Sequence, residues 1–151
     1  MSLLAALGAP AIAQEDAVDA TLVRACLEAA QSREGAPDCA GEAANACQAL
    51  PGGATTIGIS ECLMAETRVW AQLMNEALER QAGVLGREGD GALVGQLQET
   101  QRHWYAYRDA ECGLRHGIWI DGSIRTIIAG HCHLKKTAAR ALELHHLGSM
   151  K

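Results

Sequence analysis

The residues best suited to recognising a partner lie in one stretch, residues 97–112, which reads LQETQRHWYAYRDAEC. This stretch holds three of the chain's five aromatic residues and two of its arginines: Arg102, Trp104, Tyr105, Tyr107 and Arg108. Trp, Tyr and Arg are the residue types that contribute most to binding energy at protein interfaces. The pattern therefore predicts a protein-binding surface that includes Arg102, Tyr105 and Arg108.

No residue in this stretch breaks a helix, and a helical period places five of its side chains on one face: Leu97, Gln101, Trp104, Arg108 and Cys112. Such a stripe suits burial against other helices, with Trp104 in the core and Tyr105 pointing away from it. A structural role for the charged residues is the alternative. Arg108 would then donate to a carbonyl or carboxylate between helices, and Asp109 would hold a loop such as residues 117–123.

The chain shows no nucleophile–base arrangement and no metal-site spacing. The polar residues that could serve a catalytic site have simpler roles as solvent-facing carboxylates or helix caps: Glu66, Glu76, Glu79, Ser60 and Ser123. Residues two apart on a helix, such as His131 and His133, point about 200° away from each other and do not chelate one ion. The cysteines lack the Cys-x-x-Cys spacing of zinc sites. We therefore predict no catalytic residue, no metal and no cofactor.

Six cysteines in a chain of 151 residues indicate disulfides, which form in oxidising compartments outside the cytoplasm. The sequence by itself does not choose among the many pairings that six cysteines allow. We favour Cys112–Cys132, which would close a helix hairpin across the turn at residues 121–122. For the other four we favour Cys26–Cys39 and Cys47–Cys62, each joining neighbouring helices across a loop that contains Gly and Pro.

The N-terminal segment has the features of an export signal. Residues 2–13 are apolar and uncharged, and residues 11–13 offer the small side chains that a signal peptidase reads. We expect cleavage after Ala13, so that residues 1–13 form the signal peptide and residues 14–151 form a single domain. No later stretch has the length and apolar character of a membrane span. The mature protein is therefore expected in the periplasm or outside the cell.

Apolar periodicity and turn residues indicate five helices, near residues 16–32, 39–50, 60–85, 92–115 and 124–147. We predict an all-α fold of four or five helices, stapled by disulfides, in which the helix over 92–115 is the spine against which the others pack. Asp38, Ser60 and Ser123 are the expected N-caps, and Gly130 is expected to bend the last helix. The inner stripe of the 60–85 helix is expected at seven residues: Leu63, Thr67, Trp70, Met74, Ala77, Leu78 and Leu85.

Seven residues follow a Q-R-x-W-x-x-Y-R-D-x-x-C pattern: Gln101, Arg102, Trp104, Tyr107, Arg108, Asp109 and Cys112. Further matches follow at Gly122, Ser123, Cys132, Thr137, Arg140 and Leu144. Over about residues 62–144 the chain thus resembles the LprI-like lysozyme-inhibitor family of bacterial envelope proteins. In the preceding helix Asn75 matches the family pattern, whereas Ala71 and Leu78 stand where the family tends to have Asp and Tyr.

The resemblance implies a binding protein, not an enzyme, which inhibits a lysozyme or a related muramidase by covering its substrate cleft. The formal charge of −5 suits a cationic partner and argues against nucleic acid. Two alternatives are a structural or scaffolding envelope protein and an immunity protein against a wall-degrading toxin. An inhibitor should present an exposed loop with polar residues, for which residues 83–91 and 118–123 are the candidates. A scaffold should instead show an extended apolar patch.

Overall fold

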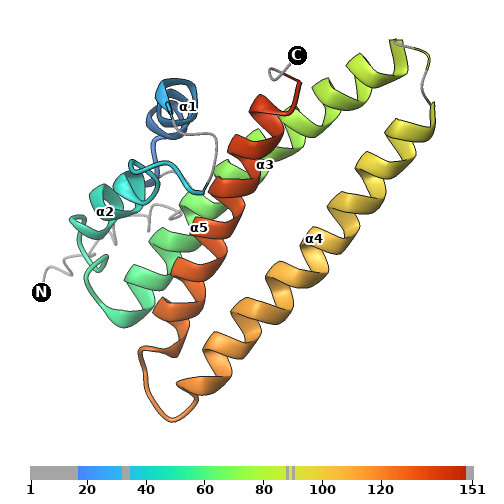
Figure 1. Ribbon diagram of the computed structural model, residues 1–151. Helices are drawn as coiled ribbons and strands as arrows, with labels where there is room; N and C mark the ends of the chain where they lie inside the picture. Colours follow the sequence, from blue (N-terminus) through green and yellow to red (C-terminus); the bar gives the residue numbers. More distant parts are fainter. Residues whose placement is uncertain (1–16, 32–34, 88, 90, 149–151) are drawn as a thin grey trace, which may run out of the picture.

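The structure, a computed structural model, describes residues 17–31, 35–87, 89 and 91–148. This part of the chain contains five helices and no strand, which confirms the predicted all-α fold: α1 (Ala20–Ala29), α2 (Glu42–Gln48), α3 (Thr56–Arg87), α4 (Gly91–Ile118) and α5 (Arg125–His146) (Figure 1). The predicted signal peptide, residues 1–13, lies outside the described residues. None of these five helices combines the length and the apolar character needed to cross a membrane.

Helices α3 and α5 form the centre of the fold, with α1 and α2 on one side of this pair and α4 on the other (Figure 1). Helix α3 buries ten residues and α5 buries eight, whereas α4 buries only Leu97, Gln101 and Cys112. The prediction that residues 92–115 form the spine is therefore wrong. The aromatic residues of α4 lie at the edge of the core or in solvent, and the largest set of buried residues belongs to α3.

Small side chains allow α3 and α5 to approach each other closely. A Cβ atom added at Gly130 of α5 would lie 3.2 Å from Cδ1 and 3.3 Å from Cβ of Leu63 on α3. Further along α5, Ala138 and Ala141 are fully buried. Gly130, where we expected a bend, thus lies inside a continuous helix and makes room for a neighbouring side chain. On α3 five of the seven residues of the predicted inner stripe are buried, and the other two, Leu78 and Leu85, are half-buried.

Two of the predicted N-caps, Ser60 and Ser123, do not cap a helix. Helix α3 begins before Ser60, and the hydroxyl of Thr55 accepts a hydrogen bond of 3.0 Å from the backbone N–H of Gly58 at that start. Helix α5 has Ile124 as its N-cap residue, with no side-chain capping bond. The chain enters α5 from a turn in which the first helical N–H already donates to a backbone carbonyl, so a serine cap is not required there.

Glu66 of α3 is buried and caps α2, although it was expected on an exposed helix face. Its Oε1 accepts from the backbone N–H of Gly41 and its Oε2 from that of Ala44, both at 2.7 Å. The indole N–H of Trp70 donates to Oε1 at 2.9 Å. Gly41 is the N-cap residue of α2 and has a φ of +108°, a conformation that favours glycine. The carboxylate of Glu66 therefore takes the place of the predicted cap, Asp38.

Glu76, also expected to face solvent, pairs with Arg24 of α1. The guanidinium donates to both carboxylate oxygens, at 3.0 and 3.1 Å. These hydrogen bonds favour the charged form, and they hold the pKa of the Glu76 carboxyl below its usual range. The two-pronged pair orients α1 against α3. Of the three carboxylates predicted to face solvent, only Glu79 is exposed, whereas Glu66 is buried and Glu76 is half-buried.

The three favoured disulfides are present: Cys26–Cys39, Cys47–Cys62 and Cys112–Cys132, with Cα–Cα distances of 5.8, 5.7 and 5.5 Å. The first joins α1 to the segment before α2, the second joins α2 to α3, and the third joins α4 to α5. Helices as short as α1 and α2 are marginally stable alone. The first disulfide therefore ties α1 to the segment before α2, and the second ties α2 to the central helix α3.

The capping role of Glu66 gives a test of the fold. Glu66→Gln keeps the size of the side chain but replaces one accepting oxygen with an NH₂ group, which faces a backbone N–H and cannot accept its hydrogen bond. We expect it to lower the free energy of unfolding by about 2 kcal/mol, because a buried donor is left unsatisfied. Urea denaturation with the disulfides intact measures this loss. The matched control, Glu79→Gln on the exposed face of α3, should change stability by less than about 0.5 kcal/mol. Equal stability of the two variants would contradict the capping role.

Candidate functional site

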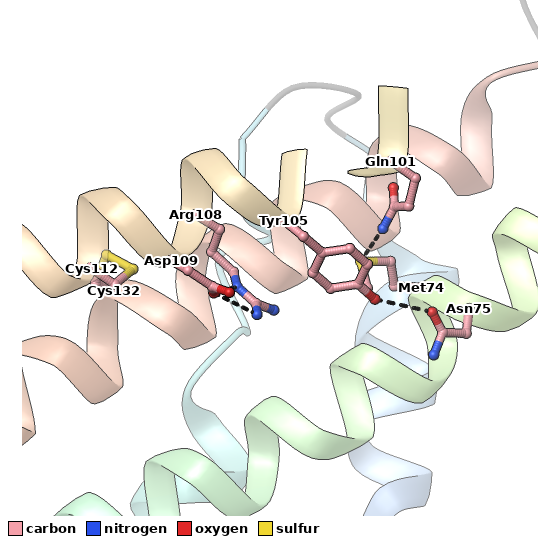
Figure 2. A network of polar contacts seen from close by, with 8 residues as sticks. All are labelled: Met74, Asn75, Gln101, Tyr105, Arg108, Asp109, Cys112 and Cys132. Atoms are coloured by element: carbon pink, nitrogen blue, oxygen red, sulfur yellow. Dashed lines mark hydrogen bonds and ion pairs between the residues drawn. A yellow bond between two sulfur atoms is a disulfide. The ribbon is translucent and has the colours of Figure 1, made fainter. Parts of the chain in front are cut away.

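Gln101, a motif residue of α4, connects three helices. Its side chain is buried, and its amide N–H donates to Sδ of Met74 on α3 at 3.4 Å (Figure 2). Its carbonyl oxygen accepts from Nε of Arg140 on α5 at 3.0 Å. Arg140 in turn pairs with Glu143 at 3.0 Å. The motif positions 101 and 140 thus hold α3, α4 and α5 together.

Arg108 lies over the aromatic rings of α4 and pairs with its neighbour in the chain. The guanidinium carbon is 5.1 Å from the ring centre of Trp104 and 5.0 Å from that of Tyr105. Two of its N–H groups donate to one carboxylate oxygen of Asp109, at 2.9 and 2.7 Å (Figure 2). The expected bond to another helix and the expected hold on the loop at residues 117–123 are therefore both wrong. Short, direct pairing with Asp109 satisfies the charge locally.

The two tyrosines of α4 differ in exposure, and Tyr105 does not point to solvent as we expected. Tyr105, predicted to point to solvent, is half-buried, and its hydroxyl donates to Oδ1 of Asn75 on α3 at 3.4 Å (Figure 2). Tyr107 is 57% exposed. Its hydroxyl accepts from Nζ of Lys136 on α5 at 2.9 Å, and the same ammonium lies 4.3 Å from the ring centre. Because α4 faces both α3 and α5, its inner face is wider than one helical stripe.

The three residues predicted to bind a partner differ in how much of each side chain is exposed. Tyr105 and Arg108 lie together, and the side chain of Arg108 is only 16% exposed. Arg102 has a side chain that is 70% exposed and forms an ion pair with Glu99 on the same helix. A partner-binding role for these residues stays a prediction, and Arg102 is the one that offers most of its side chain to solvent.

The end of the α4–α5 hairpin, residues 114–124, is here called the hairpin tip. It holds five of the thirteen large apolar side chains that are exposed in the described part of the chain: Leu114, Ile118, Trp119, Ile120 and Ile124. Of the three tryptophans, Trp70 is buried and Trp104 is half-buried, while Trp119 is 51% exposed. Sequence reasoning selected residues 118–123 as a loop but missed the apolar residues that flank it.

Backbone hydrogen bonds hold the hairpin tip in a defined turn. The N–H groups of Trp119, Ile120 and Gly122 donate to carbonyls within the tip or the last turn of α4, at 3.3, 3.2 and 2.9 Å. The side chain of Arg125 donates to the carbonyl of Ile120 at 2.8 Å. The Cys112–Cys132 disulfide closes the base of the hairpin. The apolar side chains are thus presented on a turn that is ordered before any partner arrives.

A basic pocket of about 480 Å³ lies beside the hairpin. Its basic side chains come from both helices, Arg115, His131, Lys135 and Lys136, and Arg115 pairs with Glu111 at 2.8 Å. Nζ of Lys135 donates to the carbonyl of Ala40 at 2.6 Å, and Lys136 binds a tyrosine hydroxyl, so both ammonium groups have neutral partners. Residues 113–136 carry four Lys or Arg and one Asp, a formal charge of +3 in a chain of −5. This end of the molecule is therefore suited to anionic groups.

His133 lies half-buried on α5 near Arg108 and Asp109 of α4. Loss of solvent lowers the pKa of this imidazole, the positive charge of Arg108 lowers it further, and the charge of Asp109 partly opposes both effects. Among the described residues, no group of three or more His, Cys, Asp or Glu side chains lies close enough together to hold a metal ion.

The lowered pKa of His133 predicts a pH dependence of stability. Below about pH 6.5 the unfolded chain takes up a proton that the folded chain resists, so stability should fall as the pH falls. The variant His133→Gln should show a smaller drop in Tm between pH 7.5 and 5.5 than the native chain. His131→Gln, on the exposed face of the same helix, is the control and should keep the native drop. Parallel Tm profiles of all three proteins would contradict the assignment.

Comparison with known proteins places these features in a family. A family model described as lysozyme inhibitor LprI matches residues 46–144. The match spans α3, α4 and nearly all of α5, with every motif residue and two of the three disulfides. Neither the curated proteins nor the solved structures contain a match to the chain. Because the family model covers well over half of its length, the chain belongs to the LprI family of lysozyme inhibitors.

Proposed function

We propose that the chain is an exported binding protein that inhibits a lysozyme-type cell-wall hydrolase by covering its substrate cleft. The observation that carries this proposal is the family match over residues 46–144. The matched segment includes the interlocked motif side chains of α3, α4 and α5, which fix the shape that a partner would meet. In the proposed complex this protein binds over the catalytic cleft of the enzyme and keeps the cell-wall substrate out of it.

The family and the three disulfides indicate a location outside the cytoplasm. We place the protein in the periplasm or the secreted fraction, reached by cleavage of the predicted signal peptide at residues 1–13. A wall hydrolase that attacks the bacterium meets its substrate in the same compartment. The proposed location therefore brings inhibitor and enzyme together.

Charge supports the encounter with such an enzyme. The net charge of −5 attracts a cationic partner, and opposite net charges raise the rate of association. Salt at physiological strength screens this attraction beyond about 8 Å. Attraction alone therefore brings the two proteins together without fixing the complex, and inhibition requires a shaped contact at the cleft.

The distribution of exposed apolar residues bears on the scaffold alternative. A scaffold should show an extended apolar patch, but the largest group of exposed apolar side chains lies on one narrow hairpin tip. The others are spread over α1, the α2–α3 loop, α3, α4 and the C-terminal end. The tip is apolar, unlike the polar loop that we expected of an inhibitor, but it is a narrow group and not the extended apolar face expected of a scaffold. An immunity protein against a wall-degrading toxin would bind its enzyme through the same kinds of contact and would differ only in its target.

The proposal is tested by direct binding. The oxidised chain from Gln14 onward is titrated into c-type, g-type and i-type lysozymes in a calorimeter, and residual hydrolysis of cell walls is recorded in parallel. We expect a Kd below about 1 μM for at least one type, together with loss of its activity.

A salt series separates inhibition from simple attraction between charges. Binding that leaves the activity intact and fades as salt rises would reflect charge alone. Failure to bind any of the three enzyme types would overturn the proposed function for this chain.

A further inference from the structure

We propose that the hairpin tip is the segment that enters the enzyme's cleft, with the indole of Trp119 in a sugar-binding subsite. This inference rests on the proposed function and names the surface through which it acts. It differs from the expectation drawn from residues 97–112, because the tip lies beyond that stretch and its residues are not those predicted to bind a partner.

The tip has the composition of an interface anchor. Trp119 and Ile120 are 51% and 53% exposed on consecutive positions of a turn, flanked by exposed Leu114, Ile118 and Ile124. Tryptophan is among the residues that most often dominate binding energy, and its large rigid ring costs little conformational entropy on binding. Ligand clefts are concave and lined mainly by apolar and aromatic groups. A single turn that carries a tryptophan between isoleucines has the complementary chemistry.

The tip is also organised in advance. The guanidinium of Arg125 bonds the carbonyl of Ile120 at 2.8 Å, and the disulfide Cys112–Cys132 closes the hairpin. Ordering a flexible loop at an interface opposes binding, and a loop that is already ordered avoids much of that cost. The turn therefore presents Trp119 in the conformation in which it would dock.

Charge identifies the kind of cleft that the tip fits. Residues 113–136 carry +3, so the remainder of the chain carries −8 to give the total of −5. A glycoside hydrolase places two carboxyl groups beside the bond that it cleaves. The cations at the tip are Arg115, which also pairs with Glu111, and Arg125, which directly follows the tip, and their guanidinium groups match such a cleft. The acidic remainder would instead face the cationic outer surface of the enzyme, so the two charge regions set one orientation.

The test compares two equally exposed side chains at opposite ends of α5. Trp119→Ala removes the proposed anchor, and Leu147→Ala removes an apolar side chain that is also 51% exposed. Against a lysozyme that the native chain inhibits, we expect Trp119→Ala to weaken both binding and inhibition at least about 10-fold. Leu147→Ala should stay within about 2-fold of the native chain. Far-UV circular dichroism and Tm confirm that both variants are folded.

Two further measurements give readouts that do not depend on the variants. An N-acetylglucosamine oligosaccharide that fills the cleft should weaken binding of the native chain in proportion to its occupancy. Amide hydrogen exchange in the complex should show new protection at residues 114–124.

The outcomes separate the inference from the function on which it rests. Inhibition retained by Trp119→Ala, with no new protection at the tip, overturns the inference and leaves the proposed function standing. The inference is also overturned if Trp119→Ala still inhibits but loses binding to anionic lipid vesicles, since the tip would then dock on a membrane. If the native chain inhibits no lysozyme, both the function and the inference fall.

Discussion

The buried carboxylate of Glu66 is the constraint on which the N-terminal half of the fold depends. A carboxylate removed from water is stable only among hydrogen-bond donors, and here the donors are two N–H groups of α2 and the indole of Trp70. Helix α2 has seven residues and no cap of its own. Helix and carboxylate thus depend on each other. Their contact sets where Cys47 meets Cys62, and through the preceding segment it sets the place of α1.

The all-α fold, the inner face of α3 and the three disulfides are predictable because each depends on spacing within one helix or across one short loop. The cap at Glu66 is not, because its backbone donors lie 25 and 22 residues away in the chain. A signal is nevertheless present. Glu66 lies between Leu63 and Trp70 on the buried side of a helical stripe, and a carboxylate at such a position requires donors from elsewhere.

The candidate site is predictable only in part. The composition of residues 97–112 marks α4 as unusual, and the family pattern within it is confirmed by the match over residues 46–144. Periodicity does not reveal that α4 contacts two helices. The sequence therefore does not show that Tyr105 meets Asn75 on α3 and that Tyr107 meets Lys136 on α5. The flanking residues of the tip are hidden for a similar reason. Ile124 has the spacing of a core residue of α5, but it lies just before that helix begins and is exposed, whereas Leu114 lies off the Leu97–Cys112 stripe of α4.

The order of the disulfides has a consequence for how the protein matures. The cysteines pair in order along the sequence, the first with the second, the third with the fourth and the fifth with the sixth, with separations of 13, 15 and 20 residues, and no bridge encloses or crosses another. A chain that enters an oxidising compartment N-terminus first exposes Cys26 and Cys39 before Cys47, and so on to Cys132. An oxidant that joins thiols as they emerge therefore makes the native set directly. For a chain exported in this way, the order of the disulfides requires no reshuffling of mispaired bonds by an isomerase.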